Sequence, residues 1–456
     1  MTPGPPTSQR SRAEARFRPL VGAAALVGLV LRLAWVRYAT REPQGLFDPA
    51  RYVGYARVIA DGQGMIEPWS GHPTAYYPPG YPWFLGILTW FTQPFTDQVW
   101  TVAAVTQSIL GAATVVLAAL VARRLAGPSA GAVAAVVLAV YPNLIFHSGA
   151  VLGETLYNAL FMAFLVACLG RRWPDDITNR RALLAGLLLG LAVMVRPISL
   201  AVLPVAVGVW WWSHRDRRRA LVQGALLVAG VVACMAPWTV RNALRMDDLV
   251  WMSTNTGDNL CIGHGPGATG AFSARDECAT EHNFLDGPAA EIAADREKTR
   301  IALDAIREDP GREPWLTWRR FWYMWLRDGD HDGILAVQSY RTDRFIPEAT
   351  EARLSYTADV VYWAVASTGA VGLVFLLRRR RPEDLLLVGS AVMTAAVPLA
   401  FFGDSRFKVP VIPLLIVASA CLAAEVARQV RAVDRTDAGP GEPAGHDLSD
   451  AQRPTR

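Results

Sequence analysis

Long apolar runs separated by short polar segments make up most of the chain. A helix needs about 20 apolar residues to cross the hydrocarbon core of a bilayer. Ten runs approach or exceed that length, and the fifth and sixth are the shortest. They occupy residues 19–39, 98–122, 129–147, 150–170, 182–197, 199–213, 220–238, 358–377, 384–402 and 409–427. This pattern predicts an all-α polytopic membrane protein.

Clusters of arginine follow the alternation of these runs. Loops with an excess of Lys and Arg stay on the cytoplasmic side of a membrane. The clusters are Arg10, Arg12, Arg16 and Arg18, then Arg123 and Arg124, then Arg171, Arg172, Arg180 and Arg181, then Arg215 and Arg217 to Arg219, then Arg378 to Arg381, and last Arg428 and Arg431. We therefore expect a multi-pass protein of the plasma membrane with both termini in the cytoplasm.

This orientation divides the chain into regions and places the first loop, residues 40–97, outside the cell. The regions are a cytoplasmic N-terminal segment (1–18), a transmembrane bundle (19–238), a small extracytoplasmic region (239–357), C-terminal transmembrane helices (358–427) and a disordered cytoplasmic tail (428–456). The basic N-terminus lacks a small-residue cleavage site after its apolar run, so we expect the first helix to be retained.

Several shorter segments have helical spacing but are too short to span. We expect interfacial helices in the first outer loop, over residues 49–61 and from Tyr81 onward. A further helix is predicted over residues 289–308. Tryptophans recur at helical spacing after it, which predicts an amphipathic helix in the headgroup region. They are Trp315, Trp318, Trp322 and Trp325.

Composition supports a membrane protein and narrows its partners. Hydrophobic residues make up 52% of the 456 positions, which is too apolar for a soluble enzyme with runs of this length. The net charge of +5 comes from arginines that set topology, so we expect no nucleic-acid partner. Cysteines show no metal-binding spacing, and a disulfide between Cys261 and Cys278 is possible in the outer region.

Asp48 is the leading candidate for a catalytic base. It follows the first span, where a carboxylate beside a membrane-surface helix could deprotonate a hydroxyl. Arg51 and Tyr52, on the same helix, are candidate substrate-binding residues. The alternative is that Asp48 caps the helix, with Pro49 at its first position.

Glu154 lies at the outer end of the fourth span, where an unpaired carboxylate is costly. It is our second catalytic candidate, and the alternative is a first-turn acid favoured by the helix dipole. Arg196, Arg406 and Lys408 lie at the outer ends of other spans and could hold a lipid phosphate. The alternative for each of these cations is snorkelling to the interface. A divalent metal held by Asp48 and Glu154 is possible but unsupported by any motif, and no metal ligand is assigned.

The order of several motifs resembles that of bacterial membrane glycosyltransferases. The motifs are FDPARYVGYARVIADGQG, YYPPGYPWFLGIL, ARRLAG, GETLY, GLAVMVRPISL, PWTVRN, STNTGDNLCIGHGPGATG and SRFKVPVIPLL. The resemblance is to the group of the dolichyl-phosphate-mannose protein O-mannosyltransferases, glycosyltransferase family 39 and its relatives, which have the GT-C fold. It covers most of residues 25–425. Proline stands after Asp48, where the better-known protein mannosyltransferases have a second acid.

The resemblance implies an enzyme that takes a sugar from a polyprenyl-phosphate carrier and attaches it to an acceptor hydroxyl on the extracytoplasmic face, usually with inversion. Asp48 would be the general base, Glu154 a second acid shaping the acceptor site, and Arg406 with Lys408 the clamp for the donor phosphate. The acceptor could be a cell-envelope glycan, a lipid or a protein, and no cofactor beyond the lipid-linked donor is expected.

A transporter or flippase for lipid-linked sugars is the competing hypothesis. In that case Arg196, Arg406 and Lys408 would guide the headgroup of the lipid-linked sugar. Transport requires access from both faces, whereas the polar clusters predicted here share one face with the large region 239–357. The sequence therefore favours transfer over transport.

Overall fold

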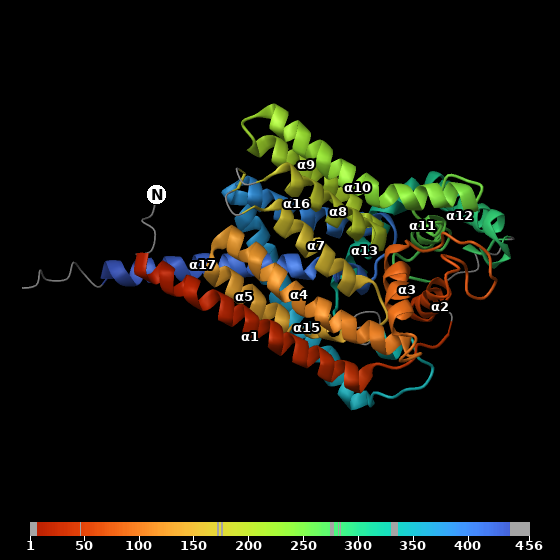
Figure 1. Cartoon of the computed structure of the whole chain (residues 1–456), viewed down its shortest axis with the longest axis horizontal. Helices are drawn as coiled ribbons and strands as arrows, with labels where there is room; N and C mark the ends of the chain where they lie inside the picture. Colours follow the sequence, from red (N-terminus) through yellow and green to blue (C-terminus); the bar gives the residue numbers. More distant parts are fainter. Residues whose placement is uncertain are drawn as a thin grey trace, which may run out of the picture.

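The computed structural model describes residues 7–437 except 46, 171–172, 175–176, 274–277, 281, 283 and 330–335. These described residues form helices and no β-sheet (Figure 1). The helices are α1 (Thr7–Ala39), α2 (Asp48–Ala60), α3 (Gly80–Thr92), α4 (Val99–Ala126), α5 (Pro128–Ala139), α6 (Pro142–Phe146), α7 (Glu154–Cys168), α8 (Asn179–Val195), α9 (Val202–Ser213), α10 (Arg217–Arg245), α11 (Thr256–His264), α12 (Pro288–Glu308), α13 (Glu313–Trp325), α14 (Ala336–Ser339), α15 (Glu348–Arg379), α16 (Pro382–Ala396) and α17 (Ile412–Asp437).

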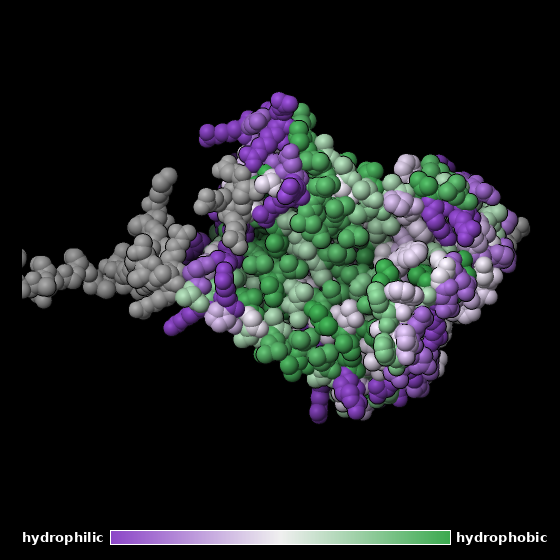
Figure 2. All heavy atoms as spheres, in the orientation of Figure 1, coloured by the Kyte–Doolittle hydropathy of each residue, from purple (hydrophilic) through white to green (hydrophobic). Residues whose placement is uncertain are grey.

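An apolar belt crosses the middle of the molecule between two polar ends (Figure 2). Each of the ten predicted spans contains a helix, and the all-α polytopic fold is confirmed. Within the described residues, six helices are long and apolar enough to cross a bilayer, or seven if α5 and α6, bent by 59°, count as one span. Two further predicted spans, which contain α7 and α9, are shorter apolar helices.

Buried Arg32 of α1 stabilises the break between α5 and α6. The guanidinium of Arg32 donates to the carbonyls of Ala139 (3.2 Å) and Leu138 (3.4 Å), which end α5. The last carbonyls of a helix lack partners within it, and inside a membrane they have no water to bind. An arginine in the first span therefore supplies the donors that this break requires.

Glycines allow α8 and α10 to pack closely. A Cβ atom added at Gly186 would lie 2.2 Å from the carbonyl oxygen of Leu227, and one at Gly230 would lie 2.6 Å from the backbone nitrogen of Leu187. Small residues at such crossings let helix backbones approach each other within a membrane. This pair forms the rigid support beside the cavity described below.

The helices α2, α3, α11 and α12, with the segments that join them, form what we call the cap, at one end of the bundle (Figure 1). Glu291 of α12 ties the cap together, since its carboxylate accepts from the Thr74 hydroxyl (2.7 Å), the Ala75 backbone (2.9 Å) and the Thr254 hydroxyl. The buried carboxylate of Glu291 thereby joins the first loop, at Thr74 and Ala75, to the segment that contains Thr254.

The predicted short helices of the cap are confirmed with small shifts in their ends. Residues 49–61, the segment from Tyr81 and residues 289–308 correspond to α2, α3 and α12. The tryptophan-rich helix is α13, with Trp318 57% and Trp322 45% exposed. However, α10 continues beyond residue 238 to Arg245, and α15 begins before residue 358, at Glu348. Most of the predicted tail, from residue 438, lies outside the described residues.

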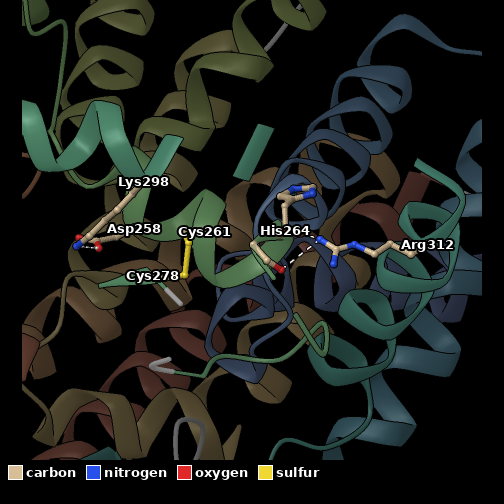
Figure 3. Close-up of a disulfide and its surroundings, with 7 residues drawn as sticks. Asp258, Cys261, His264, Cys278, Lys298 and Arg312 are labelled. Atoms are coloured by element: carbon tan, nitrogen blue, oxygen red, sulfur yellow. Dashed lines mark hydrogen bonds and ion pairs between the residues drawn. A yellow bond between two sulfur atoms is a disulfide. The ribbon is translucent and has the colours of Figure 1, made fainter. Parts of the chain in front are cut away.

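A disulfide joins Cys261 of α11 to Cys278 (Figure 3), as the sequence allowed. The other cysteines, Cys168, Cys234 and Cys421, are free. Disulfides persist in oxidising compartments, and the placement of the cap outside the cytoplasm stays a prediction.

The pKa of Asp295, on α12, provides a test of how the cap is packed. Burial raises this pKa to about 6, although the Gly257 backbone N–H donates to its carboxylate (2.6 Å) and favours the charged form. The folded state therefore keeps a proton that the unfolded state loses near pH 4. Stability is lost as the pH rises from about 4 to 6.

We expect Asp295→Asn to stabilise the protein at pH 7 by roughly 1 kcal/mol after allowance for solvent screening, and to give no gain at pH 4. Thermal unfolding of the two proteins in detergent at both pH values measures this difference. An unchanged or lowered unfolding temperature for the variant at pH 7 would show that Asp295 carries no such cost.

Candidate active site

A cavity of about 690 Å³ lies where the cap meets the bundle. Its lining comes from the start of α2, the segment 76–81, the turn after α8, the segment 253–262 and the turn before α17. Asp48, Arg51, Tyr52, Arg196 and Arg406 all contribute to this lining. The structure therefore brings five of the seven predicted site residues to one cavity.

Arg406 connects two predicted acids that lie far apart in the sequence. Its Nη1 donates to Oδ2 of Asp48 (2.8 Å), and its Nε donates to Oε1 of Glu154. Arg406 belongs to the 3₁₀ helix η7 (Ser405–Lys408), which Asp404 caps by accepting from the Arg406 backbone N–H (2.7 Å). This short helix fixes the backbone from which the arginine reaches both carboxylates.

Glu154 is fully buried and binds two arginines. Oε1 of Glu154 accepts from Arg196 as well as from Arg406, and each arginine side chain is 14% exposed. Burial alone would lower the pKa of Arg406, but Glu154 and Asp48 hold that pKa well above its usual value. Both arginines therefore present positive charge to the cavity, and Glu154 positions them.

Asp48 does not cap α2. Phe47 is the N-cap residue, and α2 has no side-chain capping bond. The Asp48 carboxylate instead accepts from the Tyr77 hydroxyl at Oδ1 (2.7 Å) and from Arg406 at Oδ2, and it is 32% exposed. Burial, followed by the charge of Asp48, raises the pKa of Tyr77, so this tyrosine stays a proton donor. The capping alternative is wrong, and the carboxylate faces the cavity.

Arg51 and Tyr52 form part of an aromatic wall. The Arg51 guanidinium lies over the rings of Tyr76 (5.5 Å) and Trp69 (5.7 Å). The Tyr52 ring contacts Tyr81 edge-on at 4.9 Å. Aromatic faces and fixed cations of this kind suit a polar ring such as a sugar, whose C–H faces stack while its hydroxyls accept or donate.

Lys408 does not reach the cavity. It is fully buried, 3.2 Å from Asp328, and donates to the carbonyls of Arg327 and Ser405. Residues two apart in a 3₁₀ helix point in different directions because the helix has three residues per turn. Arg406 and Lys408 therefore serve different contacts, and the predicted two-residue clamp reduces to Arg406 with Arg196.

The sequence analysis missed a polar wall on the cap side of the cavity. Asp258 of α11 accepts from the Tyr76 hydroxyl (2.7 Å) and from Lys298 (2.5 Å; Figure 3). Asn255 and Asn259 flank it in the lining. The polar run STNTGDN was the signal that could have identified this wall. The bundle side of the cavity thus contributes Arg196 and Arg406, and the cap contributes Arg51 together with the hydrogen-bonding groups of this wall.

The acids and histidines of the described residues do not cluster as metal ligands would. Among the residues that the structure describes, no group of three or more His, Cys, Asp or Glu side chains could hold an ion. Asp48 and Glu154 are joined through the guanidinium of Arg406. In the described residues, the guanidinium of Arg406 therefore lies between the two carboxylates that a shared metal would have to contact.

Replacing Glu154 tests whether it supports the two arginines. We expect Glu154→Gln to lower the free energy of unfolding by about 3 kcal/mol, because removing one member of a buried ion pair leaves charge uncompensated. Thermal unfolding in detergent measures the loss. Glu42→Gln is the control, since Glu42 forms an exposed pair with Arg57 at 3.9 Å. Equal small effects of the two substitutions would contradict the role given to Glu154.

Comparison with known proteins bears on the fold of the chain. Residues 75–273 match the sequence profile of glycosyltransferase family 87. No curated protein matches the sequence significantly.

Solved structures with a similar fold include the oligosaccharyltransferase AglB of Archaeoglobus fulgidus. Its apo form is 14% identical with a TM-score of 0.55, over 94% of this chain and 53% of that one. Its complex with an inhibitory peptide and a dolichol-phosphate is 16% identical with a TM-score of 0.53, over 95% and 53%. This chain thus spans about half the length of that enzyme.

ArnT of Cupriavidus metallidurans bound to undecaprenyl phosphate is 14% identical over 91% of this chain and 80% of that one, with a TM-score of 0.40 that is too low to support an argument. The matching profile is that of family 87, and membership of family 39 is not shown. The chain therefore has the fold of the oligosaccharyltransferase AglB, and its residues 75–273 match the profile of glycosyltransferase family 87.

Proposed function

We propose that the protein transfers a sugar from a polyprenyl-phosphate-linked donor to an acceptor hydroxyl on the extracytoplasmic face of the plasma membrane. The observation that carries this proposal is the ion-pair network of Asp48, Arg406, Arg196 and the buried Glu154, because the first three of these residues line one cavity. These four side chains come from segments that are distant in the sequence. Each of them lies at a helix end or in a turn.

The donor phosphate binds at Arg196 and Arg406. Both guanidinium groups line the cavity, and arginine suits the planar, multidentate recognition of phosphate. The apolar bundle beside them suits a prenyl chain, which enters from the membrane. The complex of the similarly folded AglB with a dolichol-phosphate supports a donor of this class.

Asp48 acts as the general base. The acceptor hydroxyl gives its proton to the Asp48 carboxylate while its oxygen attacks the anomeric carbon of the sugar. The bond from that carbon to the phosphate oxygen breaks, and the electron pair leaves with the prenyl phosphate. Arg196 and Arg406 stabilise the charge on the leaving phosphate. One displacement of this kind inverts the anomeric centre.

Arg406 couples donor binding to base activation. Its guanidinium is shared between Asp48 and Glu154 in this structure. A donor phosphate competes with Asp48 for the same N–H groups, so binding of the donor releases one oxygen of Asp48 to accept a proton. The base is therefore most available when the donor is in place, and this order disfavours attack without a donor.

The acceptor binds at the polar wall of Asn255, Asp258 and Asn259. Asp258 is balanced by Lys298, so this wall offers hydrogen bonds with little net charge. Neutral hydroxyl-rich acceptors, as in an envelope glycan or a glycolipid, fit such a surface.

Asp48→Asn provides the direct test of the base. We expect sugar transfer by the purified protein to fall by about 10²–10⁴-fold, because the amide accepts no proton. The assay uses prenyl-phosphate sugars as donors in detergent and follows product by mass spectrometry. Thermal unfolding should stay near that of the wild type, and the donor should bind at least as tightly, because the neutral amide competes less with the donor phosphate for Arg406.

Asp61→Asn is the matched control. Asp61 lies at the other end of α2, is exposed and lines no part of the cavity. Sugar transfer by Asp61→Asn should equal that of the wild type. Full transfer by folded Asp48→Asn would remove Asp48 as the base, and failure of the wild type to form product with any prenyl donor would favour the transport hypothesis.

A further inference from the structure

A second cavity, of about 330 Å³, lies between α3, the end of α8 and α10. A thin wall separates it from the candidate active site. Pro79 and Met194 line the second cavity, whereas their neighbours Pro78 and Val195 line the first. The two cavities are therefore distinct and adjacent.

The lining of this second cavity combines apolar groups with two cations. Met65, Trp83, Cys234 and Trp238 contribute apolar surface, and Arg241 and Arg245 are its charged residues. The lining contains no Asp or Glu. Two cations without an acid beside an apolar chamber favour an amphipathic anion as the occupant.

Arg241 is fixed in place by the cap. It donates to the carbonyls of Thr74 (2.8 Å) and Met65, and its guanidinium lies 4.8 Å from the centre of the Trp238 ring. The Trp238 indole in turn donates to the carbonyl of Met252 (2.6 Å). These contacts, and one to the Asn242 amide oxygen (3.1 Å), involve uncharged groups. Glu291 acts favourably on Arg241 but lies outside the lining of the cavity.

Arg245 has a different environment. It is exposed at the last residue of α10, and it has no hydrogen-bond or ion-pair partner among the residues that the structure describes. Its charge acts unfavourably on Arg241 nearby. An anion placed between these two guanidinium groups would relieve their repulsion.

The position of this cavity matches the surface of a bilayer. The helix α10 is one of the candidate spans, and Arg245 is its last residue on the cap side. Trp83 is 41% exposed beside it. Tryptophan and arginine concentrate at headgroup depth, where an aromatic ring contacts the chain region and a cation contacts phosphate.

We propose that this second cavity binds a lipid phosphate, with the phosphate at Arg241 and Arg245 and the first part of the lipid chain against Met65, Trp83 and Cys234. The lipid is either an anionic phospholipid or a prenyl phosphate, since both carry this chemistry. The proposal stands apart from the transfer reaction, because none of these residues lines the candidate active site.

Lipid binding can be measured by native mass spectrometry of the full-length protein in detergent. The probes are phosphatidylglycerol, undecaprenyl phosphate and, for zwitterionic headgroups, phosphatidylcholine. Undecaprenyl phosphate is tested in the Arg406→Gln background so that the first cavity contributes little. We expect Arg245→Gln to weaken binding about fivefold, the effect of removing one cation near a membrane surface.

Arg37→Gln is the matched control. Arg37 is an exposed arginine in the last turn of α1, another spanning helix that ends on the cap side, and it lines neither cavity. If Arg245→Gln weakens the binding of phosphatidylglycerol but not of undecaprenyl phosphate, the cavity is a phospholipid site. If it weakens the binding of undecaprenyl phosphate but not of phosphatidylglycerol, the cavity is a prenyl phosphate site. Equal binding of every probe to the wild type, Arg245→Gln and Arg37→Gln overturns the proposal.

Labelling of Cys234 gives a second readout at the cavity itself. Cys234 is partly exposed in the lining, whereas the free cysteines Cys168 and Cys421 are buried. An added lipid probe should slow the reaction of Cys234 with a membrane-permeant maleimide in the wild type and in Arg37→Gln, and should do so less in Arg245→Gln. Unchanged labelling under saturating lipid would place the bound lipid elsewhere and contradict the proposal.

Discussion

The pairing of Arg406 with two carboxylates holds the candidate active site together. Asp48 begins α2, Glu154 begins α7, and Arg406 lies in the turn before α17, so one guanidinium joins the cap to two parts of the bundle. Glu154 also holds Arg196, from the turn after α8. Buried charges are tolerated only when they are paired, so the network fixes the distance between these four segments.

The cap gives this network its second side. Glu291 ties the segments around Thr74 and Thr254 to α12, which brings the polar wall of α11 opposite the arginines. In the resulting cavity the bundle side contributes Arg196 and Arg406, and the cap side contributes Arg51 and the hydrogen-bonding groups of the polar wall. This arrangement suits a lipid-linked anion at the arginines and a hydroxyl acceptor at the polar wall. The second cavity adds Arg241 and Arg245 at the cap end of α10.

Much of this arrangement could be predicted from the sequence because membranes constrain it strongly. Apolar runs located the bundle helices, and arginine clusters placed Asp48, Glu154, Arg196 and Arg406 on one side, where they could meet. The role of Lys408 could not be predicted, because the direction of a side chain depends on the 3₁₀ turn that carries it. The contact of Tyr77 with Asp48 and the acid Asp328 beside Lys408 depend on packing between distant segments, which no local pattern reports.

In the proposed reaction, Arg406 exchanges Asp48 for the phosphate of the donor. A cryo-electron microscopy structure of the wild-type protein with a bound prenyl-phosphate sugar analogue tests it most directly. The account predicts the phosphate within hydrogen-bond distance of both Arg196 and Arg406, with Glu154 still bound to them and one oxygen of Asp48 turned toward the anomeric carbon. A phosphate bound away from both arginines, with the contact between Arg406 and Asp48 intact, would contradict it.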